Sequence, residues 1–168
     1  MNKSEIAKFL GRNPITGDTI FHELAAAGSV SLLNRIREIF GGPYDSFINK
    51  LNGGATCVHV AAKLHRAHRA IQVIELLVEM GADLNASDYL SGATVLHHAV
   101  WYEDRKLVTW LCQQSPRINL DARRRDGLTA YQMAFLEQNG PMKKILQDHG
   151  ANCEEPQEPG TPSSGPSH

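Results

Sequence analysis

Four stretches of the chain share one alternation of a short apolar block, a polar turn and a longer apolar block. They begin at intervals of 35 to 38 residues, at Gly17, Gly54, Gly92 and Gly127. In each stretch a Thr stands two positions after the Gly and precedes an apolar run with the spacing of a short amphipathic helix. The Thr hydroxyl is suited to cap that helix. The pattern therefore predicts four copies of one structural unit.

A longer apolar block follows in each copy and predicts a second helix. From Val73 to Met80 the apolar side chains fall on one stripe, and Gly81 is suited to end the helix in a left-handed conformation. We interpret residues around 65–72 as an insertion that precedes this second helix. A single helix pair cannot bury its own apolar face, so the pairs must stack. The sequence thus predicts an all-α solenoid of four helix-turn-helix repeats, at residues 17–53, 54–91, 92–126 and 127–153.

The two ends of the chain differ from the repeats. Residues 3–10 predict a short helix, so residues 1–16 are expected to cap the first repeat. Residues 154–168 hold four prolines and three glutamates but no large apolar side chain. Such a composition cannot bury enough surface to offset the entropy of ordering. We expect a disordered tail that is inert or makes a weak electrostatic contact with a basic partner surface.

The polar residues that recur in every repeat predict a structural role. They are Thr19, Thr56, Thr94 and Thr129, followed three positions later by His22, His59, His97 and Gln132 respectively. A residue pair that returns at the same place in each unit is typical of a scaffold. We therefore expect each His to bond the Thr hydroxyl and nearby turn backbone, and not to bind a metal.

Composition and charge exclude several classes of protein. The 168 residues are 42% hydrophobic, which suits one globular domain. Lys plus Arg is 17 and Asp plus Glu is 18, so the net charge of −1 argues against a general nucleic-acid binder. No apolar run approaches the length of a membrane span, and the N-terminus does not resemble a signal peptide. We expect neither nucleic acid nor membrane as a partner, and the three cysteines suit a reduced, cytosolic chain.

No group of residues predicts catalysis or a bound cofactor. His65 and His68 stand three positions apart, but two ligands without a carboxylate or thiol at helical spacing are thin support for a zinc site. The adjacent glycines, Gly41–Gly42 and Gly53–Gly54, lie outside any phosphate-binding motif. Cys57 and Cys112 occupy apolar positions and are expected to be buried, whereas Cys153 is expected to be an exposed thiol. We predict a binding protein and not an enzyme, with no cofactor and no metal.

The four copies resemble the ankyrin repeat, whose signature is G-x-T-P-L-H-x-A-A followed by L-L-x-x-G-A-D-x-N-A. The resemblance covers about residues 17–152, and GATCVHVAA with VIELLVEMGADLNA carries it most clearly. The signature Pro is absent in every copy, where Ile20, Cys57, Val95 and Ala130 stand instead. The resemblance implies an ankyrin solenoid that binds proteins through its turn tips and the exposed face of its first helices.

The order of motifs in repeats two to four is similar to that of the inhibitors of κB (IκB) and their short bracovirus relatives, the vankyrins. Tyr131–Gln132 replaces the usual L-H pair, as in the terminal IκB repeat, and GDTIFHELA is similar to the family's first repeat. The resemblance implies a monomeric, immunosuppressive inhibitor of host Rel/NF-κB proteins that blocks DNA binding or nuclear import. The expected location is the host-cell cytoplasm, with the nucleus as a second compartment.

Cellular IκB proteins carry a D-S-G-x-x-S signal for regulated degradation, and the printed sequence contains no such motif. Asp45–Ser46 is followed by Phe47. The resemblance therefore implies an inhibitor that this signal would not remove. Two other hypotheses are a cyclin-dependent-kinase inhibitor with four ankyrin repeats and a ubiquitin-ligase adaptor. The Tyr-Gln repeat and the GDTIFH opening favour IκB over the first, and residues 154–168 cannot form the F-box-like helix that the second requires.

Eight residues are candidates for partner contact. They are Tyr89, Leu90, Trp101, Tyr102, Arg123, Arg124, Arg125 and Phe135. The aromatic pair falls where the repeat normally permits polar residues and has the composition of a binding hot spot, although packing between repeats is the alternative. The three arginines predict a basic turn tip. This tip would contact an acidic patch on a partner, act as a weak import signal, or simply be a solvated turn. Phe135 aligns with an aromatic position of the terminal IκB repeat, whereas Trp110 replaces a consensus Leu and is expected in the core.

Overall fold

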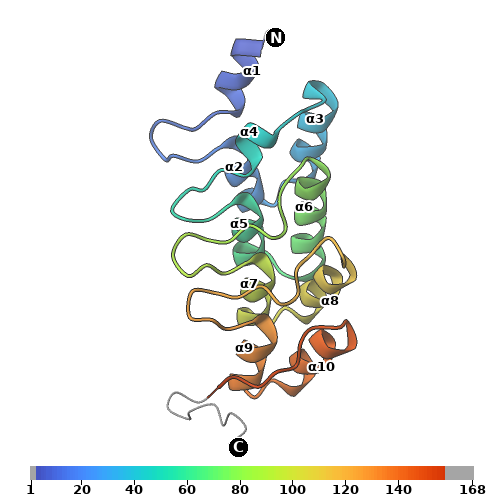
Figure 1. The fold of residues 1–168 in the computed structure, drawn as a ribbon. Coiled ribbons are helices and arrows are strands. Elements are labelled where there is room, and N and C mark those ends of the chain that lie inside the picture. Colours follow the sequence, from blue (N-terminus) through green and yellow to red (C-terminus); the bar gives the residue numbers. More distant parts are fainter. Residues whose placement is uncertain (1–2, 158–168) are drawn as a thin grey trace, which may run out of the picture.

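The computed structural model describes residues 3–157, and the regular elements in this range are helices. In chain order they are α1 (Lys3–Leu10), α2 (Ile20–Ala27), α3 (Val30–Phe40), α4 (Asp45–Ile48), α5 (Cys57–Leu64), α6 (Ala67–Glu79), α7 (Val95–Trp101), α8 (Arg105–Gln113), α9 (Ala130–Leu136) and α10 (Gly140–Asp148). Helices α2, α5, α7 and α9 form an inner layer, and α3, α6, α8 and α10 form an outer layer (Figure 1). The turns that connect successive repeats project to one side as fingers. The predicted all-α solenoid of four helix pairs, with α1 at its N-terminal end, is confirmed.

Each inner helix begins one residue after a Thr with extended backbone. The four threonines form a capping box with the residue three positions later, which is His in the first three repeats and Gln in the fourth. This cap satisfies backbone N–H groups that the first turn of a helix leaves without partners. The inner helices therefore start at defined positions without the proline of the repeat signature.

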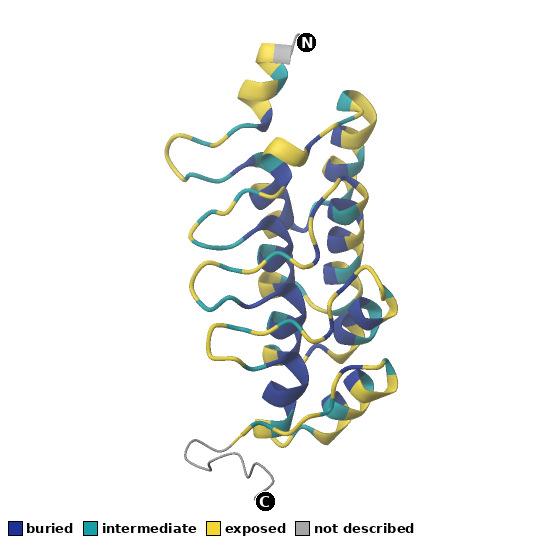
Figure 2. Cartoon of the chain, in the orientation of Figure 1, coloured by how far each residue is buried: buried dark blue, intermediate teal, exposed yellow. Residues whose placement is uncertain are grey.

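The hydrophobic core lies between the two layers and continues through all four repeats (Figure 2). Inner helices contribute alanines that are fully buried, namely Ala25, Ala61, Ala99 and Ala134. Because alanine has no side chain beyond Cβ, the outer helices can approach closely. Leu33, Leu77, Leu111 and Leu146 of the outer helices are also fully buried, and each such leucine contributes about 2 kcal/mol of hydrophobic stabilisation.

The prediction that residues up to 72 precede the second helix of repeat two is wrong. Helix α6 begins at Ala67, so most of the supposed insertion lengthens the helix at its N-terminal end. Ala67 has a φ of 49°, a left-handed value that is uncommon for a residue other than glycine. Its N–H donates to Oδ2 of Asp104 in the next repeat at 2.6 Å. This contact to another repeat is invisible in the local sequence.

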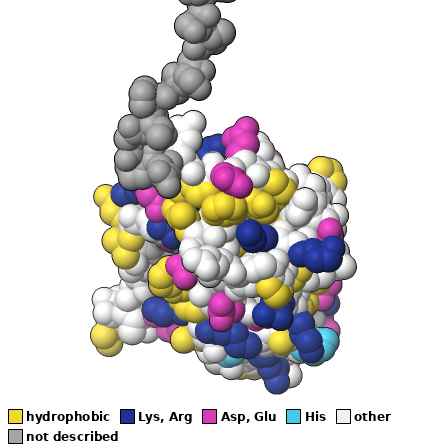
Figure 3. Space-filling model, turned by 90° about the horizontal axis from the view of Figure 1, so that it is seen from below, with side chains coloured by type: hydrophobic (Ala, Val, Ile, Leu, Met, Phe, Trp, Pro, Cys, Tyr) yellow, Lys and Arg dark blue, Asp and Glu magenta, His cyan; other side chains and the backbone are white. Residues whose placement is uncertain are grey.

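The last described residues continue along the fourth repeat without forming a helix. The backbone N–H of Asn152 donates to Oδ1 of Asp121 at 2.7 Å, and Glu154 lies 4.0 Å from a guanidinium nitrogen of Arg123. Most of the predicted disordered tail, residues 158–168, lies outside the described residues. Within residues 3–157, no helix has the length and apolar character needed to cross a bilayer. Seen from below, Lys and Arg side chains gather along one edge of the molecule beside a His (Figure 3).

Candidate functional site

The recurring Thr and His residues join each repeat to the next. In repeat two, Nδ1 of His59 accepts the backbone N–H of Thr56 at 3.3 Å and lies 2.8 Å from its hydroxyl. Nε2 of the same ring lies 3.0 Å from the carbonyl oxygen of Ala93 in repeat three. His22 and His97 make the same contacts in repeats one and three. These histidines therefore lie between repeats and leave the exposed surface to other residues.

Burial keeps these imidazoles neutral. Removal from water, with a smaller contribution from the neighbouring His98, lowers the pKa of His59 to about 4. The pKa of His97 is also lowered to about 4, chiefly by burial, and that of His22 is lowered for the same reason. In the fourth repeat Gln132 makes the equivalent cap, with its Oε1 accepting the N–H of Thr129 at 3.1 Å. An amide that does not ionise thus replaces the imidazole where the stack of repeats ends.

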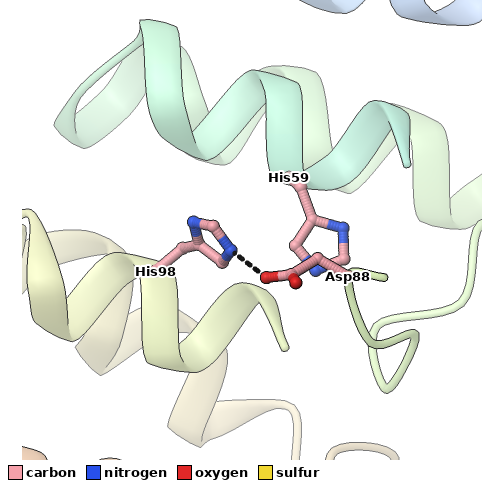
Figure 4. Close-up of side chains that lie close together, drawn as sticks. All are labelled: His59, Asp88 and His98. Atoms are coloured by element: carbon pink, nitrogen blue, oxygen red, sulfur yellow. Dashed lines mark hydrogen bonds and ion pairs between the residues drawn. The ribbon is translucent and has the colours of Figure 1, made fainter. Parts of the chain in front are cut away.

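His59, Asp88 and His98 form a cluster that the sequence pattern does not predict (Figure 4). Their potential ligand atoms lie within 4.8 Å of one another, a spacing that could suit a divalent cation. However, Nδ1 of His59 accepts an N–H, so its Nε2 carries the proton and donates to Ala93. Ligation would require the opposite tautomer and the loss of both hydrogen bonds. The cluster therefore reduces to a pair, His98 and Asp88.

The His98–Asp88 pair connects an inner helix to the finger before it. Nε2 of His98 donates to Oδ2 of Asp88 at 2.9 Å, and the carboxylate also accepts the N–H and hydroxyl of Ser91 at 2.6 and 2.8 Å. Burial opposes ionisation of Asp88, but these hydrogen bonds outweigh it and lower the pKa to about 2. The ring of His98 also meets those of His59 and Tyr102, with centroids 5.0 and 6.1 Å apart. In the sequence, the D-x-x-S spacing of Asp88 and Ser91 and the adjacent histidines His97 and His98 are the features that could have indicated this pair.

A groove lies where the third inner helix meets the fingers of repeats three and four. Its volume is about 250 Å³, and the lining residues are Ser91, Ala93, His97, His98, Trp101, Tyr102, Arg124 and Met133. Trp101 is 64% exposed at the C-terminal end of α7. Tyr102 is half-buried, and the guanidinium of Arg66 lies 4.5 Å from its ring centroid. The two aromatic residues singled out from the sequence therefore lie together, with Trp101 as the more accessible one.

Tyr89 and Leu90 lie at the tip of the finger between repeats two and three, 64% and 76% exposed. The N–H of Tyr89 donates to the carbonyl of Gly54 in the preceding finger at 2.7 Å. On the other side, the guanidinium of Arg125 lies 5.1 Å from the tyrosine ring centroid. Neighbouring fingers thus support one another and hold the two apolar side chains in the solvent.

The three consecutive arginines point to different partners. Arg123 donates to the carbonyl of Gly127 at 2.7 Å, and Arg125 covers the tyrosine at the neighbouring tip. Arg124 is half-buried, where it pairs with Asp126 at 2.6 Å and lines the groove. The simple basic tip expected from the sequence is therefore incorrect for Arg124. The side-chain direction of a turn residue depends on the finger beside it, which lies about one repeat away.

The structure also gives the degree of burial of Trp110, Phe135 and Cys153. Trp110 packs against the core, as its position suggested, but it is only partly buried and lies at the edge of the core. Phe135 is also partly buried, and the ammonium group of Lys143 lies 4.7 Å from its ring centroid. Cys153 was expected to be exposed but is half-buried beside the last repeat. Cys57 and Cys112 are buried as expected, and burial raises the pKa of their thiols to about 12 and 11.

Comparison with known protein families identifies the class first. The family described as ankyrin repeats (3 copies) matches residues 21–124, more than half of the chain. The chain is therefore an ankyrin-repeat protein. The crystal structure of the ankyrin repeat domain of Bcl-3, described as a member of the IκB family, superposes with a TM-score of 0.70 at 27% identity. That match covers 82% of this chain, which spans 57% of the Bcl-3 chain.

Sequence relatives identify the family within this class. I-kappa-B like protein N2 of Microplitis demolitor bracovirus is 38% identical over 81% of this chain and 75% of its own length. I-Kappa-B like protein G1 of the same virus is 35% identical over 81% of this chain and 76% of its own. The chain belongs to the bracovirus I-kappa-B-like proteins, a family of ankyrin-repeat protein-binding modules.

Proposed function

We propose that the protein is a stoichiometric inhibitor of host Rel/NF-κB transcription factors. Its membership of the IκB-like family supports this role in general. The observation that carries the proposal is the exposure of three large side chains. Tyr89 and Leu90 lie at a finger tip and Trp101 at the end of α7, and they are 64%, 76% and 64% exposed. Large apolar side chains held in solvent by a rigid scaffold are typical of protein-binding hot spots.

The proposed mechanism is occlusion. The fingers and inner helices would cover the Rel dimer and its basic localisation segment, so that DNA or an importin could not bind. Rigid packing between repeats supports this mechanism, because an already ordered surface loses little conformational entropy on binding. Hydrogen bonds between fingers, such as that from the N–H of Arg125 to the carbonyl of Ser91 at 2.9 Å, provide this order.

A gel-shift titration tests the proposal directly. Purified insect Rel dimers bound to κB DNA should lose the DNA as the protein is added, and the protein should co-precipitate with the dimer. Retention of the DNA complex at micromolar excess, together with no co-precipitation, would refute Rel inhibition. A complex that forms while DNA stays bound would refute occlusion of DNA but retain the partner, and an importin competition would then be measured.

We also propose that the protein acts in the host-cell cytoplasm, with the nucleus as a second compartment. This location follows from the proposed partner, because Rel factors retained outside the nucleus cannot reach DNA. Fractionation of host cells that express the chain checks it. In the same cells, the fraction of Rel protein in the nucleus should fall after immune stimulation.

A further inference from the structure

The outer layer carries a second groove, between α6 and α8, that the proposed Rel-binding surface does not use. Its volume is about 460 Å³, and its lining residues are His68, Ile71, Arg105, Lys106, Thr109, Trp110 and Gln113. These residues come from two outer helices, whereas Trp101 of the first groove belongs to the inner helix α7. The two grooves can therefore be tested separately.

Trp110 and Ile71 supply the apolar part of this groove. Both are partly buried and pack against the core, so each keeps part of its surface accessible. Helix α8 already directs Leu107, Val108 and Leu111 into the core, where they are fully buried. Trp110 is a fourth large side chain of α8, and it lies on the adjacent face of the helix, at the boundary between α6 and α8. An accessible Trp held by packing is a suitable contact for a large apolar side chain of a partner.

Two cationic side chains and one imidazole border this apolar surface. Arg105 and Lys106 are exposed at the start of α8, and His68 is exposed near the start of α6. No carboxylate is among the groove's lining residues. An apolar floor with a cationic rim complements an acidic chain segment that carries a large apolar side chain.

We propose that the groove between α6 and α8 binds an acidic segment of a partner protein with one large apolar side chain. The apolar side chain would lie against Trp110 and Ile71, and neighbouring carboxylates would pair with Arg105 and Lys106. Charge complementarity selects this occupant over an apolar helix, which would leave the cations without partners. The surface would allow a second protein to bind while the fingers and inner helices hold another.

A peptide titration against the full chain tests the proposal. The probe is a synthetic peptide rich in Asp and Glu with one central Phe, and binding is followed by calorimetry. We expect saturable binding with one peptide per chain. The Trp110→Leu variant and the double variant Arg105→Glu/Lys106→Glu should each weaken it roughly tenfold or more. Carboxylates are favourable in the first turn of a helix, so the double variant should still fold, as circular dichroism would verify.

Matched controls separate this groove from other surfaces. Arg35→Glu changes charge by the same amount per site at an exposed position of the outer helix α3, and Trp101→Ala removes the aromatic side chain of the inner groove. Both should bind the peptide as the unaltered chain does. Unchanged affinity in the double variant would overturn the proposal. Equal affinity for a peptide with Ser in place of Phe, or tighter binding of duplex DNA or phosphatidylserine vesicles, would also overturn it.

Discussion

The carboxylate of Asp104 holds the first turns of two outer helices from successive repeats. Its Oδ2 accepts the N–H of Ala67, the first residue of α6, at 2.6 Å. Its Oδ1 accepts the N–H of Leu107 in the first turn of α8 at 3.1 Å. Asp104 is only 7% exposed, and Ala67 has a left-handed backbone. One side chain therefore satisfies helix ends that belong to different repeats and stabilises the junction between them.

Asp104→Ala should lower the free energy of unfolding by about 2–3 kcal/mol, because one helix loses its cap and another its buried N–H partner. Urea denaturation followed by circular dichroism measures the change. Lys106→Ala, an exposed substitution in the same helix, should alter stability by less than about 0.5 kcal/mol. If both variants unfold at the same urea concentration, the link between the repeats has no energetic importance.

The buried histidines predict a loss of stability in mild acid. The pKa of His59 and His97 is about 4 in the folded chain, below the ordinary value of 6.5. Below pH 6.5 the unfolded chain binds protons that the folded chain does not, so unfolding becomes easier as pH falls toward 4. Each histidine should contribute a decrease on the order of 1 kcal/mol per pH unit in this range, and no further decrease below pH 4.

Urea denaturation at a series of pH values measures this dependence. His97→Gln copies the amide that occupies the same position in the fourth repeat. This variant should lose the part of the pH dependence that belongs to His97, because an amide does not titrate. An identical pH dependence in the variant and the unaltered chain would show that His97 does not titrate as described.

Two equivalent glycines should differ in their tolerance of a side chain. Gly92 and Gly127 both have positive φ, at 70° and 85°. A Cβ at Gly92 would lie 3.0 Å from Cγ and 3.2 Å from the backbone nitrogen of Arg125, whereas nothing lies within 4 Å at Gly127. Gly92→Ala should therefore destabilise the chain by about 1 kcal/mol more than Gly127→Ala. Thermal unfolding of both variants tests this, and equal midpoints would argue against close contact between the fingers.

Trp101→Ala should weaken binding to a Rel dimer at least about tenfold without loss of stability, because the indole is largely in solvent. Surface plasmon resonance against an immobilised dimer measures the affinity. Ile39→Ala is the control, since Ile39 is 65% exposed on the outer helix α3, away from the inner groove. Comparable losses in the two variants would indicate that the partner does not use the inner groove.

The boundaries of the inner helices could be predicted from sequence because local interactions determine them. Thr19 caps α2 through the residue three positions later, and the same short-range pair returns in each repeat. Tyr89 and Leu90 were also recognised as tip residues, because large apolar side chains in a turn have no core to enter. By contrast, α6 starts earlier than expected, because the N–H of its first residue, Ala67, donates to the carboxylate of Asp104, which is 37 residues away.

The sequence by itself determined the repeat, its helices, its alanine- and leucine-rich core and its relation to the IκB-like proteins, because these depend on patterns within one repeat length. Tertiary structure alone decided that Arg124 turns inward, that His98 pairs with Asp88, and that Trp110 lies at a surface groove. Each of these outcomes depends on which side chain stands on the adjacent finger or helix. Stacking brings such neighbours together from different repeats, so the space and charge around a residue are properties of the assembled solenoid.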